Sequence, residues 1–300
     1  MSYAEFKRRA REHQIRFREQ ELGVGYHNCP NVLKYGDARK GLIFFEKFRE
    51  EILEELKKPV RSTSSKPSGQ MLPNLLRSEH IPYNIFFPLK KDKEGCVELF
   101  NTILGSEEIV EICDIEIEYH PEPLVEYLDD HTAFDVYVSY VDTKNRLGGI
   151  GIEVKYTEKE YLLNKNTREY KRVKNEMTGK TCLFPNYLNA TINSGYYRED
   201  VSYDVLVLNK FRQIWRNHIL GASMVLNGDI QIFTSVTLYP KANAHFSEVV
   251  PKYKELLSGV GLRSFVALTY EELFDFIEEC IDIDVCRDWV EYLRRRYLVK

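Results

Sequence analysis

The chain has 300 residues, of which 43% are hydrophobic and 29% charged, and its formal net charge is −4. These values are typical of a soluble globular protein with a sizeable core, in one large domain or two small ones. The net charge excludes a protein whose whole surface is positively charged, although a local basic surface could still bind nucleic acid. No segment is apolar for long enough to span a membrane, and the start lacks a signal peptide's apolar core. The six cysteines form no CxxC pair, so reduced thiols and a cytoplasmic location are expected.

Helices are expected ahead of the main fold. Residues 2–22 are typical of a basic, exposed helix with few apolar anchors. Residues 35–58 predict one amphipathic helix, with Asp37 capping its start and apolar side chains at helical spacing. Residues 59–74 are rich in serine, proline and glycine, and therefore predict a linker or long loop. We expect an N-terminal helical extension at residues 1–60, followed by a second domain at 61–300.

The rest of the chain predicts a mixed α/β domain. Two short helical segments are expected at 75–90 and 95–105, the first interrupted by Pro82 and Pro88. Alternating apolar residues predict a strand at 110–120, then two strands within 134–158 that are joined by a glycine-ended turn. A long polar stretch with many lysines and arginines follows at 156–200. A helix is expected at 204–226, a strand at 229–240, a strand running into a helix at 264–280, and a terminal helix at 285–300.

The two strands within 134–158 carry three charged residues in an otherwise apolar pattern: Asp135, Glu153 and Lys155. Side chains alternate across a strand, so these three lie on the face opposite to the apolar one. A turn centred near Asn145 would place Asp135 opposite Lys155, and opposed residues of an antiparallel pair share a face. A register shifted by two residues still leaves the three charges together. The pattern therefore predicts one small charged patch.

Two carboxylates that lie close together repel each other and lose solvation when buried. A hard divalent cation between them makes the arrangement favourable, because Mg²⁺ prefers a few carboxylate oxygens, water and phosphate. Lys155 could then hold the attacking water or neutralise charge that grows on a phosphate. The alternative is a salt bridge between Glu153 and Lys155 on a solvated sheet face, which Asp135 could join.

Two segments, "AFDVYVSY" and "GIGIEVKYTE", resemble the core motif of the PD-(D/E)XK nuclease superfamily. Asp135 stands at the aspartate of the motif, Glu153 at its second acid and Lys155 at its lysine, while Phe134 replaces the proline before the aspartate. The segments "IEVKYTE", "SEHIPYNIFFPL" and "FRQIWRNHILG" are similar to a narrower bacterial group of restriction-endonuclease-like proteins. The resemblance covers about residues 75–245, which leaves a C-terminal strand and helices at 262–300 outside the core.

The resemblance implies a restriction-endonuclease-like mixed sheet flanked by helices, and Mg²⁺-dependent hydrolysis of phosphodiester bonds, with Mn²⁺ as a substitute. The backbone carbonyl of Val154 would be a further metal ligand. In the superfamily a glutamine on the helix after the lysine strand often reaches the active site, and Gln213 matches it. Many members also have a glutamate ahead of the two strands, for which Glu79 is the first candidate and Glu118 the second.

One face of the helix expected at 204–226 bears amides and arginines: Asn209, Arg212, Gln213, Arg216 and Asn217. A polar face is often merely solvated, but arginines suit phosphate, so Arg212, Arg216 and Lys159 are expected to bind substrate. The basic stretch from Lys159 to Lys180 is either a loop that closes over the phosphate backbone or a solvated insertion.

The primary hypothesis is a nuclease that acts on nucleic acid, expected to be DNA. The first rival is a nucleic-acid-binding protein that keeps the fold without catalysis. The second is a structural or partner protein in which the charges of the two strands form a salt-bridge cluster. No membrane partner is expected, and a homodimer is left open.

Overall fold

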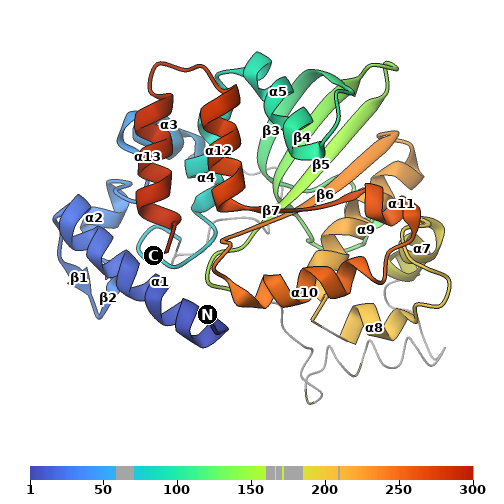
Figure 1. The fold of residues 1–300 in the computed structure, drawn as a ribbon, viewed down its shortest axis with the longest axis horizontal. Coiled ribbons are helices and arrows are strands. Elements are labelled where there is room, and N and C mark those ends of the chain that lie inside the picture. The colour runs from blue at the N-terminus through green and yellow to red at the C-terminus, as the bar shows by residue number, and fades with distance from the viewer. Residues whose placement is uncertain (59–70, 160–165, 167–170, 172–184, 209, 300) are drawn as a thin grey trace.

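The computed structural model describes residues 1–58, 71–159, 166, 171, 185–208 and 210–299. A five-stranded sheet has the order β3–β4–β5–β6–β7, with helices on both of its faces (Figure 1). The first three strands are antiparallel neighbours, whereas β6 runs parallel to β5 and β7 parallel to β6. The strands are β3 (Ile109–Tyr119), β4 (Phe134–Asp142), β5 (Leu147–Val154), β6 (Ile232–Tyr239) and β7 (Phe265–Thr269). The predicted fold class, α/β with a mixed sheet flanked by helices, is confirmed.

The register between β4 and β5 differs from the predicted one by two residues. Val136 lies opposite Ile152, so continuing the ladder by one residue places Asp135 opposite Glu153 rather than Lys155. The turn is centred on Lys144, because the Asp142 carboxylate accepts hydrogen bonds from the backbone N–H of Lys144 and Arg146, at 2.9 and 2.8 Å. The alternation of side chains keeps the acids on one side in either register.

The sheet separates two hydrophobic clusters. One face packs Val136, Val138 and Ile152 against helices from both ends of the chain. The other face packs Tyr137 and Phe233 beneath α9 (Arg212–Asn227). Phe134 belongs to this second cluster with Tyr137, although strict alternation would place it with Val136.

The N-terminal region forms part of the first cluster. Helix α1 (Tyr3–Phe17) buries Phe6, Ala10 and Phe17, so the few apolar anchors expected in this helix hold it against the core. The single helix expected at 35–58 is also wrong. It is divided into α2 (Tyr35–Arg39), a 3₁₀ turn at Glu46–Phe48 and α3 (Arg49–Glu55), because Gly41 adopts a φ of +70° that interrupts the helix. A short hairpin, β1 (Tyr26–His27) and β2 (Cys29–Leu33), was not predicted.

Helices α4 (Ile81–Leu89) and α5 (Lys93–Leu104) match the two predicted helical segments. The prolines do not interrupt α4, since Pro82 lies in its first turn and Pro88 in its last. Helices α12 (Tyr270–Cys280) and α13 (Cys286–Tyr297) are confirmed, whereas α7 (Pro185–Asn193), α10 (Ala244–Lys254) and α11 (Gly259–Arg263) were not predicted. Of the helices in the described ranges, none combines the length and apolarity needed to cross a bilayer.

The helix expected at 204–226 is two helices, α8 (Tyr203–Leu208) and α9, with Phe211 as the residue that precedes α9. Asn209 lies outside the described residues, as do Lys165, Arg168, Arg172, Lys174 and Lys180 of the basic stretch. Helix α9 rests on the sheet where Gly221 meets the ring of Phe233. The polar residues near the start of α9 are therefore fixed relative to the strands.

Acid is expected to destabilise the fold through His218, which α9 buries between the hydroxyls of Tyr253 and Ser264, at 2.9 and 2.7 Å. Burial lowers the pKa of His218 to about 3. The unfolded chain, with a histidine pKa of about 6.5, then binds a proton that the folded chain does not. Stability is therefore lost as the pH falls from about 6.5 towards 3, by up to roughly 1.4 kcal/mol per pH unit. Thermal unfolding of His218→Gln between pH 4 and 7 should show a shallower acid slope than wild type, and an unchanged slope would contradict this.

Candidate active site

Asp135, Glu153 and Lys155 meet at one end of the β4–β5 pair. The Lys155 ammonium contacts one carboxylate oxygen of Glu153. The backbone N–H of Val154 donates to the Asp135 carboxylate at 2.6 Å, where the main-chain ladder between the strands ends. The Glu153 and Lys155 side chains are only 12% and 9% exposed. The salt bridge expected in the alternative interpretation is therefore present, but it is buried rather than on a solvated sheet face.

The second carboxylate oxygen of Glu153 accepts a hydrogen bond from the side-chain amide of Asn217, on α9. Lys155 and Asn217 together fix the orientation of this carboxylate. Asn217 belongs to the polar face predicted for this helix, but no function was predicted for it. The available signal was its position four residues after Gln213, on the same side of the helix.

Acidic side chains dominate the electrostatics of the site. Burial, followed by the charges of Glu153 and Glu118, raises the pKa of the Asp135 carboxyl well above its usual range. Burial, followed by Glu153 and Glu79, raises the pKa of Glu118 to about 7. Glu118 lies in β3 and Glu79 just before α4, where Glu79 is paired with Arg77 at 2.8 Å. Both predicted glutamates therefore belong to the same acidic environment.

The oxygen atoms at this site are of the kind that bind a hard cation. Lys155 N–H donates to the carbonyl of Leu238 on β6, at 2.8 Å, so the backbone groups of the preceding residue, Val154, face β4 and Asp135. Asp135, Glu153 and the Val154 carbonyl thus offer oxygen ligands on one side of β5. Over the described ranges, no three His, Cys, Asp or Glu side chains group as a metal site. A pair of carboxylates completed by backbone and water is the kind of site that Mg²⁺ accepts.

The backbone of Lys155 is held from the far end of the chain. The buried hydroxyl of Tyr270, the first residue of α12, donates to the Lys155 carbonyl at 2.8 Å. The next residue, Tyr156, stacks on Tyr270 and accepts a hydrogen bond from Gln14 of α1, at 2.9 Å. The N-terminal and C-terminal helices therefore both position the lysine segment.

A pocket of about 200 Å³ opens beside Glu153. Gln213 and Arg216 line it together with His131, Thr132, Ala133 and Asn217. The pocket thus joins the sheet end to the start of α9.

Arg216 is held in this pocket by a network that the sequence did not reveal. Its guanidinium donates to Asp130 at 2.8 Å, to the Tyr187 hydroxyl at 2.9 Å and to Thr132 at 2.5 Å. Burial would raise the pKa of the Asp130 carboxyl, but Arg216 and the hydrogen bonds from Thr132 and Tyr187 outweigh it and lower that pKa. Asp130 and Tyr187 are far from α9 in sequence, which is why no local pattern indicated them.

Two other predicted substrate-binding residues lie elsewhere. Arg212 is buried in the first turn of α9 and is not among the residues that line the pocket. Lys159 is exposed, with its ammonium 5.3 Å from the centre of the Tyr3 ring. The structure therefore brings Gln213 and Arg216 to Glu153, but not Arg212.

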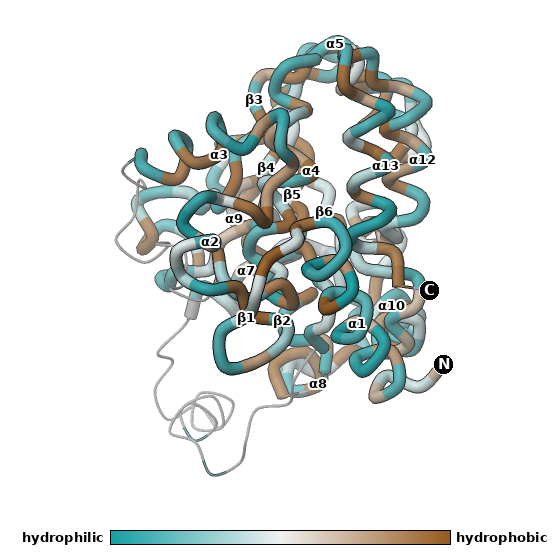
Figure 2. Tube along the Cα trace, turned by 90° about the vertical axis from the view of Figure 1, so that its left-hand side faces the viewer, coloured by the Kyte–Doolittle hydropathy of each residue, from teal (hydrophilic) through white to brown (hydrophobic). Residues whose placement is uncertain are grey.

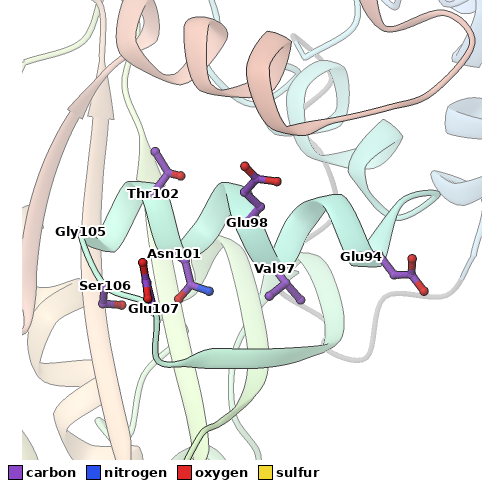
Figure 3. A pocket seen from close by; sticks show the side chains of 8 residues that line it. All are labelled: Glu94, Val97, Glu98, Asn101, Thr102, Gly105, Ser106 and Glu107. Atoms are coloured by element: carbon purple, nitrogen blue, oxygen red, sulfur yellow. The ribbon is translucent and has the colours of Figure 1, made fainter.

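A second pocket lies along α5 and has a different character (Figure 3). Three glutamates line it, Glu94, Glu98 and Glu107. Glu107 lies just before β3, whose first residue, Ile109, pairs with Asp142 at the end of β4 remote from Asp135. An acidic surface repels a phosphate backbone, so this pocket does not extend the candidate site.

Comparison with known families decides what kind of protein carries this site. A family model described as the PD-(D/E)XK nuclease superfamily matches residues 2–299. The chain belongs to this superfamily. Neither the comparison with curated proteins nor that with solved structures gave a match. The superfamily match extends well beyond residues 75–245 and includes α1 and α12, the helices that hold the segment after β5.

Proposed function

We propose that this member of the PD-(D/E)XK nuclease superfamily is a metal-dependent deoxyribonuclease. The observation that carries the proposal is the meeting of Asp135, Glu153 and Lys155 beside a pocket that also presents Gln213 and Arg216. Buried acids whose charges disfavour one another are costly unless a cation joins them. Catalysis offers a reason for that cost, which a purely structural cluster does not.

Asp135, Glu153 and the carbonyl of Val154 would hold Mg²⁺, with Mn²⁺ as a substitute. When bound, such an ion polarises a phosphoryl oxygen and lowers the pKa of coordinated water. Lys155, anchored by Glu153 and Tyr270, would place its ammonium against charge that develops on the phosphate. Gln213 and Arg216 would orient the scissile phosphate, and Asn217 would keep the Glu153 carboxylate in position.

The test is cleavage of supercoiled plasmid and of linear duplex and single-stranded DNA by the purified chain, with Mg²⁺, Mn²⁺ or EDTA. We expect cleavage with either metal and none with EDTA, and an RNA substrate of the same sequence tests the preference for DNA. Salt-sensitive DNA binding with no cleavage under any metal condition would instead support the non-catalytic binding protein.

Metal binding is also expected to stabilise the fold. At a Mg²⁺ concentration ten times the dissociation constant, the free energy of unfolding should rise by about 1.4 kcal/mol, which raises Tm by roughly 2–4 °C. The Asp135→Asn variant should lose this increase, because it lacks one of the two carboxylate ligands. Thermal unfolding with and without Mg²⁺ measures the effect, and an equal increase in the variant would contradict the assignment of Asp135 as a ligand.

A further inference from the structure

Among the described residues, largely exposed aromatic side chains are concentrated at one place. The chain contains 20 tyrosines and 16 phenylalanines, most of which pack in the two hydrophobic clusters. In the ranges that the structure describes, the aromatic side chains that are largely exposed are Tyr26 and Tyr35, at 50% and 51%. Both belong to the β1–β2 hairpin and the start of α2 that follows it. Exposing two large rings has a hydrophobic cost, which a ligand that covers them would remove.

The rings are displayed on a well-supported scaffold. The His27 ring lies 5.1 Å from that of Tyr35, and Tyr26 precedes His27 in β1. We call Tyr26, His27 and Tyr35 the hairpin cluster. The buried Arg18 guanidinium donates to the carbonyls of Pro30 and Val24, and it lies 5.1 Å from the centre of the Tyr26 ring. Exposed rings that are held in place lose little entropy when a planar ligand stacks on them.

Basic residues outnumber acidic ones around the hairpin cluster, although Glu19 and Glu21 lie in the helical turn between α1 and the hairpin. Lys34, between the two tyrosines in sequence, is exposed and extends its ammonium over Gly25. Helix α1, which leads into the hairpin, has five basic and two acidic residues, in contrast to the net charge of −4 of the whole chain. Lys7 and Arg11 are exposed one turn apart along this helix. This local charge is complementary to a phosphate backbone.

Helix α1 connects the hairpin cluster with the candidate active site. At its start, the Tyr3 hydroxyl donates to the carbonyl of Thr157 at 2.8 Å, two residues after Lys155. At its end, Phe17 is followed directly by Arg18, which supports the hairpin. Figure 2 shows this largely hydrophilic helix extending from the N-terminus to the hairpin. Fifteen residues of helix span about 22 Å, a length that several nucleotides of a single strand can cover.

We propose that the hairpin cluster stacks on unpaired bases of a single-stranded nucleic acid, whose phosphates are contacted by Lys34 and the exposed basic residues of α1. Base faces are accessible to a tyrosine only where they are not stacked within a duplex, and aromatic stacking tolerates any base. The strand would extend along α1 to the site that the proposed function assigns, and in that respect the inference rests on the proposed function. It makes a strand end or an overhang the preferred substrate.

The test measures binding in EDTA, so that cleavage cannot affect it, by fluorescence anisotropy of a labelled 20-nucleotide DNA strand, the same sequence as a blunt duplex, and an RNA strand. The double variant Tyr26→Ala/Tyr35→Ala should bind the single strand at least tenfold more weakly and the duplex less than twofold more weakly. The double variant Tyr26→Phe/Tyr35→Phe keeps the rings and should bind as wild type does. The matched control, Val260→Ala/Leu262→Ala, removes two exposed apolar side chains of α11 and should leave binding unchanged.

An equal loss for single strand and duplex, or no loss for either single strand, would overturn the proposal. Weaker binding of the DNA strand, the RNA strand or both, with duplex binding retained, supports the proposal and shows whether the site accepts deoxyribose, ribose or either. Each phosphate contact on a single strand contributes roughly 0.7 to the slope of log affinity against log salt. Replacing both Lys7 and Arg11 by alanine should therefore reduce the magnitude of this slope by about 1.4. An unchanged slope would show that the strand does not contact α1. Absence of cleavage by wild type with Mg²⁺ would instead overturn the proposed function, which these binding measurements do not test.

Discussion

Replacing Lys155 by methionine is expected to reduce the rate of DNA cleavage by about 10²- to 10³-fold, the usual effect of removing one group that stabilises transition-state charge. Methionine retains most of the apolar length of the side chain but removes the ammonium that contacts Glu153. The two carboxylates remain, so the increase of Tm with Mg²⁺ should persist. The measurement is a single-turnover cleavage rate, together with thermal unfolding with and without Mg²⁺.

The matched control is Lys144→Met, which makes the same chemical change at an exposed position in the β4–β5 turn. It should cleave at the wild-type rate. Equal rates for the two variants would remove Lys155 from the mechanism. A Lys155 variant that no longer responds to Mg²⁺ would show instead that the lysine acts by supporting Glu153 as a ligand.

Replacing Gly221 by alanine is expected to have the largest effect on stability. A Cβ at this position would lie 2.1 Å from atoms of the Phe233 ring, so α9 must move away from β6. Overpacking of this kind typically lowers the free energy of unfolding by about 1–3 kcal/mol. Because α9 also carries Gln213, Arg216 and Asn217, cleavage should fall together with Tm.

Gly36→Ala, in α2, is the control for that change, since a Cβ there meets no atom within 4 Å. It should leave Tm unchanged or raise it slightly, because alanine is favoured over glycine in helices by up to about 1 kcal/mol. Similar Tm values for the two variants would show that the close approach of α9 to β6 is relaxed in solution. Thermal unfolding of both variants measures the difference in Tm.

The strands and the convergence of their charged residues could be predicted because their signals are local. The alternation of apolar residues around Asp135 and Glu153 indicated both the strands and their common charged side. The register was missed by two residues, because it depends on Asp142 capping the turn through its side chain, which strand periodicity does not contain. Convergence of the charges was nevertheless predicted, since a shift of two preserves the face.

Helix boundaries and long-range partners could not be predicted in the same way. The division of residues 35–58 depends on the conformation of Gly41, and a glycine within an amphipathic pattern is compatible with a continuous helix. The partners of Arg216, Asp130 and Tyr187, are 86 and 29 residues away in sequence. Only the tertiary fold brings such residues together, as it also brings Asn217 to Glu153.

The hydrogen bond from Tyr270 to the lysine carbonyl has a practical consequence for dissecting this protein. A shortened chain that stops at residue 245, where the recognisable motifs end, would retain each candidate metal ligand yet lose the ring that anchors Lys155 and shields Tyr156. The segment at Lys155 and Tyr156 would lose this hydrogen bond and this stacking contact. Inactivity of such a fragment would therefore reflect the loss of support for Lys155 rather than the loss of a metal ligand.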